Sequence, residues 1–205
     1  MPKRRVYLVD DEEPIRRSAS LLLKSAGFDA HAFETGTAFL DIAGALSTGT
    51  ILLDIRMPNI DGLAVQEELN ERNSPHSIVV MTGHGDIQSA VSALTGGAVA
   101  FIEKPFSKAH LLAVLDIAYL KLEEPAGYAS YLDGARNQVD SLGKREQAVL
   151  MGLAEARSNE EIARSIDMTL SELEVARARI LEQFGVEGLI PALNIAHSAK
   201  LGRGR

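Results

Sequence analysis

Five short apolar runs, each followed by a segment of helical periodicity, constrain the fold of this chain more than any other feature. They all fall within the first 124 residues, and most are rich in Val, Ile and Leu. The runs are Val6–Val9, Phe28–Ala32, Thr50–Leu53, Ser77–Met81 and Ala98–Ile102. Strands that alternate with helices favour a parallel sheet with helices on both faces. We therefore predict an α/β, doubly wound domain.

The pattern changes along the chain and suggests three parts. Residues 1–123 form the predicted α/β domain. Over residues 124–140 the apolar side chains are sparse and follow no period, which predicts a linker. Residues 141–205 carry helical periodicity alone and predict a small all-α domain.

Local signals divide the last part into short helices. Ser158 with Glu161, and Thr169 with Glu172, place a capping side chain three residues before a glutamate, the spacing of a capping box. Short helices separated by three or four residues are typical of a helix-turn-helix. The predicted helices are 144–155, 159–165, 170–183 and 189–200.

Composition and charge exclude several classes of protein. The chain contains no cysteine, which rules out a disulfide scaffold or a thiolate metal site and fits the reducing cytoplasm. No apolar run approaches the length that spans a bilayer, so we expect no membrane partner. Residues 1–124 carry 11 basic and 17 acidic side chains, whereas residues 141–205 carry nine of each. A neutral C-terminal part is a weak electrostatic signal for nucleic-acid binding.

Polar side chains follow four of the predicted strands at their carboxyl ends. Asp10 and Asp11 follow the first strand, Asp54 the third, Thr82 the fourth and Lys104 the fifth. Strand ends of a parallel sheet share one edge, where ligands bind in such folds. Converging carboxylates repel one another, and a hard divalent cation such as Mg²⁺ offsets that repulsion. With a lysine and a hydroxyl beside them, these groups suit phosphoryl transfer to one carboxylate.

These motifs carry a family resemblance. The segments Val9–Glu12, Leu53–Pro58 with Asp61–Gly62, Met81–Asp86 and Glu103–Phe106 resemble those of response-regulator receiver domains, in particular the FixJ subgroup. The resemblance covers residues 1 to about 122. It implies a flavodoxin-like (βα)5 fold and a two-component signalling protein that is not an enzyme acting on external substrates, with only self-directed phosphoryl transfer and autodephosphorylation.

The resemblance also implies roles for individual residues. Asp54 accepts a phosphoryl group from the phosphohistidine of a cognate histidine kinase. Asp10, Asp11, Asp54 and the backbone carbonyl of Arg56 surround Mg²⁺.

The same resemblance implies a switch and a dimer surface. Thr82 is the switch hydroxyl, Lys104 pairs with the phosphate through a cis Lys104–Pro105 bond, and Phe101 is the aromatic switch residue, with plain core packing as its alternative. Phosphorylation then exposes a homodimer face formed by the helix after Thr82, the strand 98–102 and the helix from Ser107. Candidate residues on the first of these helices are Ala90, Val91 and Leu94, whose spacing fits core burial equally well.

The C-terminal part resembles the LuxR/NarL-type helix-turn-helix in the segments Leu142–Glu146, Ser158–Ala163 and Leu173–Val175. In that family the helix near 170–183 enters the major groove of double-stranded DNA. The residues that the resemblance and their charge place at DNA are Lys144, Arg145, Glu174, Val175, Arg177, Ala178 and Arg179.

Two alternatives stay open from the sequence. Glu160 and Glu172 replace residues that are commonly basic and threonine in the family, so a degenerate helix-turn-helix could act through protein contacts or as a phosphate sink instead of binding DNA. The second alternative is a haloacid-dehalogenase-like phosphatase, which also uses strand-end Asp, Thr and Lys. Its first strand ends in Asp-x-Asp, unlike Asp10-Asp11-Glu12 here, and the further acid pair that it needs is missing.

Overall fold

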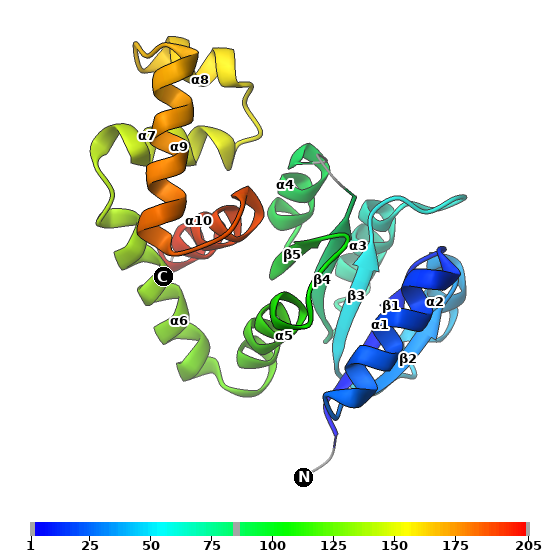
Figure 1. Ribbon diagram of the computed structural model, residues 1–205. Helices are drawn as coiled ribbons and strands as arrows, with labels where there is room; N and C mark the ends of the chain where they lie inside the picture. The colour runs from blue at the N-terminus through cyan, green and yellow to red at the C-terminus, as the bar shows by residue number, and fades with distance from the viewer. Residues whose placement is uncertain (1–2, 84–86, 204–205) are drawn as a thin grey trace. The chain divides into compact units, whose positions relative to one another are not determined.

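The computed structural model describes residues 3–83 and 87–203. Two compact units make up the chain, the first ending at Pro125 and the second beginning at Ala126. Figure 1 shows a sheet with covering helices in the first unit and helices alone in the second. Within the described residues, no helix is both long and apolar enough to span a membrane.

The first unit contains a five-stranded parallel sheet in the order β2-β1-β3-β4-β5. The strands are β1 (Arg5–Val9), β2 (Asp29–Phe33), β3 (Thr50–Asp54), β4 (Ser77–Thr82) and β5 (Ala100–Glu103). Every residue of β3 and β4 is buried, as expected for strands covered on both faces. The predicted flavodoxin-like, doubly wound fold is confirmed.

Helices cover this sheet (Figure 1). They are α1 (Glu13–Ser25), α2 (Gly36–Ala43), α3 (Gly62–Glu71), α4 (Ile87–Thr95) and α5 (Lys108–Glu123). The apolar side chains of α1 and α5 pack with alternate residues of the strands, among them Leu8, Leu52 and Val79, in one cluster. Neighbouring strand residues, such as Tyr7 and Leu53, are equally buried. Because strand side chains alternate in direction, both faces of the sheet are buried and only its ends offer polar groups a site.

The second unit is built from five helices. They are α6 (Pro125–Asp140), α7 (Lys144–Leu153), α8 (Asn159–Ser165), α9 (Leu170–Phe184) and α10 (Leu189–Arg203). Both predicted capping boxes are present, because Ser158 and Glu161, and Thr169 and Glu172, exchange side-chain and backbone hydrogen bonds. At the other end of α9, Gly185 adopts a left-handed conformation with φ of 64°, which ends the helix.

The segment 124–140 differs from its prediction. We expected a linker without periodicity, whereas the structure shows helix α6 over almost all of it. Its buried residues are Tyr128, Leu132, Ala135 and Val139, which recur every three or four positions. Short and polar residues between them hide this stripe in the sequence. The helix belongs to the second unit, where the Tyr131 hydroxyl accepts a hydrogen bond from Ser198 of α10.

Candidate functional site

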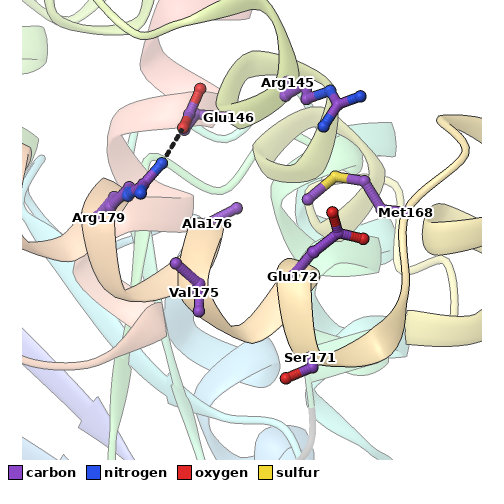
Figure 2. Close-up of a pocket in the computed structure, with 8 residues that line it drawn as sticks. All are labelled: Arg145, Glu146, Met168, Ser171, Glu172, Val175, Ala176 and Arg179. Carbon is purple, nitrogen blue, oxygen red and sulfur yellow. Dashed lines mark ion pairs between the residues drawn. The ribbon is translucent and has the colours of Figure 1, made fainter.

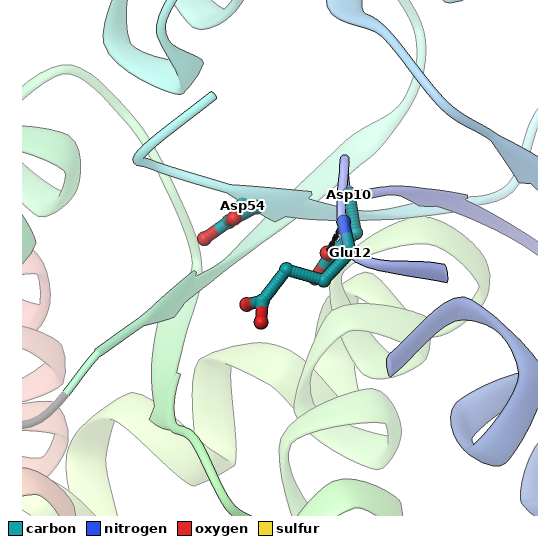
Figure 3. Close-up of side chains that lie close together, drawn as sticks. All are labelled: Asp10, Glu12 and Asp54. Atoms are coloured by element: carbon teal, nitrogen blue, oxygen red, sulfur yellow. Dashed lines mark hydrogen bonds between the residues drawn. The ribbon is translucent and has the colours of Figure 1, made fainter. Parts of the chain in front are cut away.

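Four polar side chains meet at the carboxyl edge of the sheet, as their strand-end positions predicted. Asp10 follows β1, Asp54 ends β3, Thr82 ends β4 and Lys104 follows β5. Asp10, Asp54 and Thr82 are at most 4% exposed. Figure 3 shows Asp10 and Glu12 on one segment of the chain and Asp54 on the neighbouring strand. This crevice therefore gathers charged groups that are nearly withdrawn from water.

Lys104 is the cation that holds this crevice together. Its Nζ lies 2.7 Å from Oδ2 of Asp10, 2.9 Å from Oδ2 of Asp54 and 3.4 Å from Oε1 of Glu12. The Lys104 side chain is only 10% exposed, and its peptide bond to Pro105 is cis. One ammonium thus faces three carboxylates, so the site keeps an excess of negative charge.

Burial dominates the titration of these groups. Desolvation raises the pKa of Asp54 to about 6, although hydrogen bonding and charge from Lys104 pull it down. Desolvation likewise raises the pKa of Asp10. For Lys104, desolvation lowers the pKa, but its hydrogen bonds to Asp10 and Asp54 outweigh it and the net pKa is raised. The lysine therefore stays charged, and Asp54 is mostly ionised at neutral pH.

The carboxylates could hold a hard cation. One oxygen each from Asp10, Glu12 and Asp54 lies within 4.8 Å of the others. Oxygen donors in such a cluster suit Mg²⁺ or a similar ion. Asp11, which the resemblance places at the metal, is half-buried and lies outside this group.

Glu12 was missed by the sequence reasoning. It occupies the N-cap position of α1, yet its side chain accepts no capping hydrogen bond, and its backbone N–H donates to Oδ1 of Asp10 at 2.9 Å. Its position directly after Asp10 and Asp11 was the one sequence signal that could have placed it at this site. An acidic N-cap residue that leaves its capping role is free to turn toward the crevice.

The start of α3 fixes the chain beyond Asp54. The Asp61 side chain accepts a hydrogen bond from the N–H of Ala64 at 2.8 Å and caps the helix. A Cβ on Gly62 would lie 2.2 Å from the carbonyl oxygen of Asp54, so only glycine allows this close approach. The backbone N–H of Arg56 hydrogen-bonds to the Asp54 carboxyl group. The loop after β3 therefore holds Asp54 from several sides.

The predicted switch residues lie in the interior. Thr82 donates a hydrogen bond to the carbonyl of Gly83 at 3.2 Å, and Phe101 is fully buried within β5. In this conformation Phe101 packs as a core residue. On α4, Ala90 and Leu94 are buried in the core, which is the alternative that their spacing left open beside a dimer patch.

In the second unit, α9 presents most of the predicted DNA contacts to solvent. Glu174, Val175, Ala178 and Arg179 are exposed. Arg177 is only 28% exposed, and its Nη1 lies 2.9 Å from Oε1 of Glu174. Four of these five α9 residues can therefore reach a ligand directly, whereas Arg177 lies closer to the helix.

The first turn of α7 lies near α9. Lys144 and Arg145 are exposed there, as a contact with a DNA backbone requires. Residues of both helices line a shallow hollow of about 280 Å³. Figure 2 shows Arg179 reaching toward Glu146 across it; the two side chains are 3.7 Å apart.

Hydrogen bonds from Thr169 lower the pKa of Glu172, which confirms Glu172 as the capping partner of Thr169.

Comparison with known proteins agrees with this geometry. The family description of the response regulator receiver domain matches residues 6–116. The transcriptional regulatory protein FixJ of Bradyrhizobium diazoefficiens is 36% identical over 197 residues, which cover 96% of each chain. The response regulator protein TmoT of Ectopseudomonas mendocina is 32% identical and covers 95% of this chain and 89% of TmoT.

Solved structures show the same likeness over both units. Full-length FixJ from B. japonicum matches with a TM-score of 0.59 at 36% identity, covering 98% of this chain and 99% of the other. The structure of FixJ-N matches with a TM-score of 0.55 at 36% identity and covers 57% of this chain and 93% of the other. The chain belongs to the FixJ-type two-component response regulators. It is a signalling protein that controls transcription and has a histidine kinase as its partner. The alternative of a degenerate helix-turn-helix that acts without binding DNA is not favoured.

Proposed function

We propose that Asp54 is the phosphoryl acceptor of this regulator. The observation that carries the proposal is the contact of its carboxylate with Lys104 at 2.9 Å, in a crevice that leaves Asp54 only 4% exposed. An ionised carboxylate beside a fixed ammonium suits attack on phosphorus, because the cation stabilises charge on the transferred group.

The step is a displacement at phosphorus. An oxygen of Asp54 forms a bond to phosphorus while the bond to the kinase's histidine nitrogen breaks, and that nitrogen leaves with the electron pair. Lys104 then pairs with an oxygen of the aspartyl phosphate instead of the Asp54 carboxylate, and Thr82 donates its hydroxyl to another. Hydrolysis of the same acyl phosphate resets the protein, which is the self-directed dephosphorylation expected of it.

The crevice fits Mg²⁺. Asp10, Asp54 and the Arg56 carbonyl, together with Asp11 or Glu12, would hold it. When bound, the ion neutralises negative charge on the phosphoryl oxygens. The residues fit Mg²⁺ because three carboxylates converge here and the ammonium of Lys104 neutralises only part of their charge.

The output follows from a shift between two conformations. Movement of the Thr82 hydroxyl toward the phosphoryl group leaves room for Phe101 to change its packing. The face formed by α4, β5 and α5 then pairs with a second copy of the chain. Two copies bind double-stranded DNA through α9, with Lys144 and Arg145 at phosphates.

A small phosphoryl donor tests the acceptor role without the kinase. The protein is incubated with phosphoramidate, whose P–N bond resembles that of phosphohistidine, with Mg²⁺ or with EDTA. Intact mass spectrometry should show addition of one phosphoryl group with Mg²⁺, and peptide mapping should place it on Asp54. Stable phosphorylation at another residue contradicts the proposal.

A further inference from the structure

One carboxylate on the outward face of α9 is held by a neighbouring guanidinium. Arg177 donates a hydrogen bond to Oε1 of Glu174 at 2.9 Å. The Glu174 side chain is 60% exposed and that of Arg177 only 28%, so the carboxylate faces solvent while the arginine lies against the helix. Within residues 3–83 and 87–203, the other oxygen of Glu174, Oε2, has no hydrogen-bond partner. Glu174 thus presents one acceptor oxygen, Oε2, to solvent.

The surroundings of Glu174 define what this acceptor can recognise. Val175 is 50% exposed and Ala178 is also exposed, so apolar groups flank the carboxylate. In the major groove, cytosine offers an amino donor from N4, which a glutamate accepts. Guanine presents the acceptors N7 and O6, and thymine presents the acceptor O4, all of which repel a carboxylate. Adenine has an amino donor, but the acceptor N7 lies beside it. The Glu174 carboxylate, which accepts hydrogen bonds and donates none, therefore favours cytosine.

A lone carboxylate near phosphates would weaken binding by repulsion. The guanidinium of Arg177 offsets this, because the pair is neutral as a whole. The attraction within the pair also grows when DNA displaces water from the helix surface, since the local dielectric constant falls. Arg177 therefore both neutralises and orients Glu174.

We propose that Glu174 selects a cytosine in the operator and that Arg177 is the positioning residue for its carboxylate. Arg177 then makes no phosphate contact of its own, although its charge placed it among the residues expected at DNA. This inference rests on the proposed function, because it requires α9 to lie in the major groove.

Selection from random duplex pools tests the inference with the full-length protein, activated by beryllofluoride at Asp54. The wild type should select a motif with cytosine at one position of each half-site. Glu174→Gln should change that position to adenine, because glutamine pairs with adenine through one donor and one acceptor. The preference for cytosine over adenine should reverse by about tenfold or more.

Two further variants separate recognition of the base from the effect of the net charge of α9. Arg177→Met should weaken discrimination at the same position by several-fold and leave the other positions of the motif intact. Glu182→Gln removes the same charge from an exposed site at the far end of α9, so it should raise affinity for all sequences and leave the motif unchanged.

The outcomes distinguish this inference from the function on which it rests. If Glu174→Gln selects the same base as the wild type at every position, Glu174 does not read a base and the inference fails, although DNA binding stands. A wild-type protein that selects no motif overturns the proposed DNA binding itself, and this inference with it.

Discussion

The two units of this protein handle charged side chains in opposite ways. In the first unit, Asp10, Asp54 and Lys104 come from separate strand ends and are buried together. In the second, Arg177 pairs with Glu174 three residues earlier on the same helix, at the surface. Buried charges brought together by the fold are costly and have few alternative partners. Exposed pairs contribute little to stability.

This difference predicts different responses to substitution. The crevice depends on the whole sheet, so we expect a change in one of its charges to alter both stability and phosphoryl uptake. The surface of α9 depends on local helix spacing, so we expect a change of one charge there to leave the fold intact.

The largest expected effect is loss of phosphoryl uptake in Asp54→Asn. The amide cannot act as the nucleophile, so uptake from phosphoramidate should fall to the level of a blank, as measured by intact mass. Asp41→Asn, an exposed aspartate on α2, is the matched control and should react like the wild type. Unchanged uptake in Asp54→Asn would contradict the assignment.

Lys104→Met tests the burial of charge. Without the ammonium, Asp10 and Asp54 remain buried with no cation, and the free energy of unfolding should fall by about 3 kcal/mol near pH 7. Near pH 5 the loss should be smaller, because burial raises the pKa of Asp54 to about 6 and the carboxyl group takes up a proton. Urea unfolding at both pH values measures this. Lys108→Met, at the exposed start of α5, should change little; equal losses in the two variants would contradict the account.

Asp54→Asn should have the opposite effect on stability. The folded-state pKa of about 6 exceeds the unfolded value of 3.8, so the folded protein binds the proton more tightly. The contribution of Asp54 to stability therefore becomes more favourable as the pH falls from 6 to 3.8. Above pH 6 the ionised, buried carboxylate destabilises the fold, and the variant should be more stable by about 2 kcal/mol in metal-free buffer. Urea unfolding across this range measures the difference, which should shrink toward low pH. If Asp54→Asn is less stable than the wild type near neutral pH, the ionised Asp54 carboxylate does not destabilise the fold and the prediction is wrong.

Arg179→Met should have the smallest effect on stability. Its side chain is 67% exposed and its distance to Glu146 is long, so unfolding should change by less than about 0.5 kcal/mol. Its effect should be seen on DNA, where the slope of log affinity against log salt falls by about one. Salt titration of binding measures this, and a large loss of stability with an unchanged slope would reverse the comparison.

The sequence predicted the first unit well because parallel strands bring distant residues to one edge. Asp10, Asp54, Thr82 and Lys104 could be placed together from strand ends alone. Glu12 could not, because its participation depends on whether an exposed side chain caps α1 or turns toward Lys104, and both are compatible with the sequence. Helices α8 and α9 of the second unit were predicted because capping boxes mark where they begin.

The interactions of α9 were harder to predict. The neutral charge of residues 141–205 was a weak signal for DNA binding, but charge counts do not show which arginine is held by which glutamate. Helix α6 was missed because its buried stripe includes Tyr128 and Ala135 among polar neighbours. Such a stripe becomes visible only when its packing partners in α10 are known.

We propose that the phosphorylation state of Asp54 controls the affinity of the second unit for DNA. The most direct measurement is the affinity of full-length protein for its selected operator with Mg²⁺, with and without beryllofluoride. We predict that beryllofluoride raises this affinity in the wild type and not in Asp54→Asn. Equal affinity of the wild type in both conditions would contradict the account.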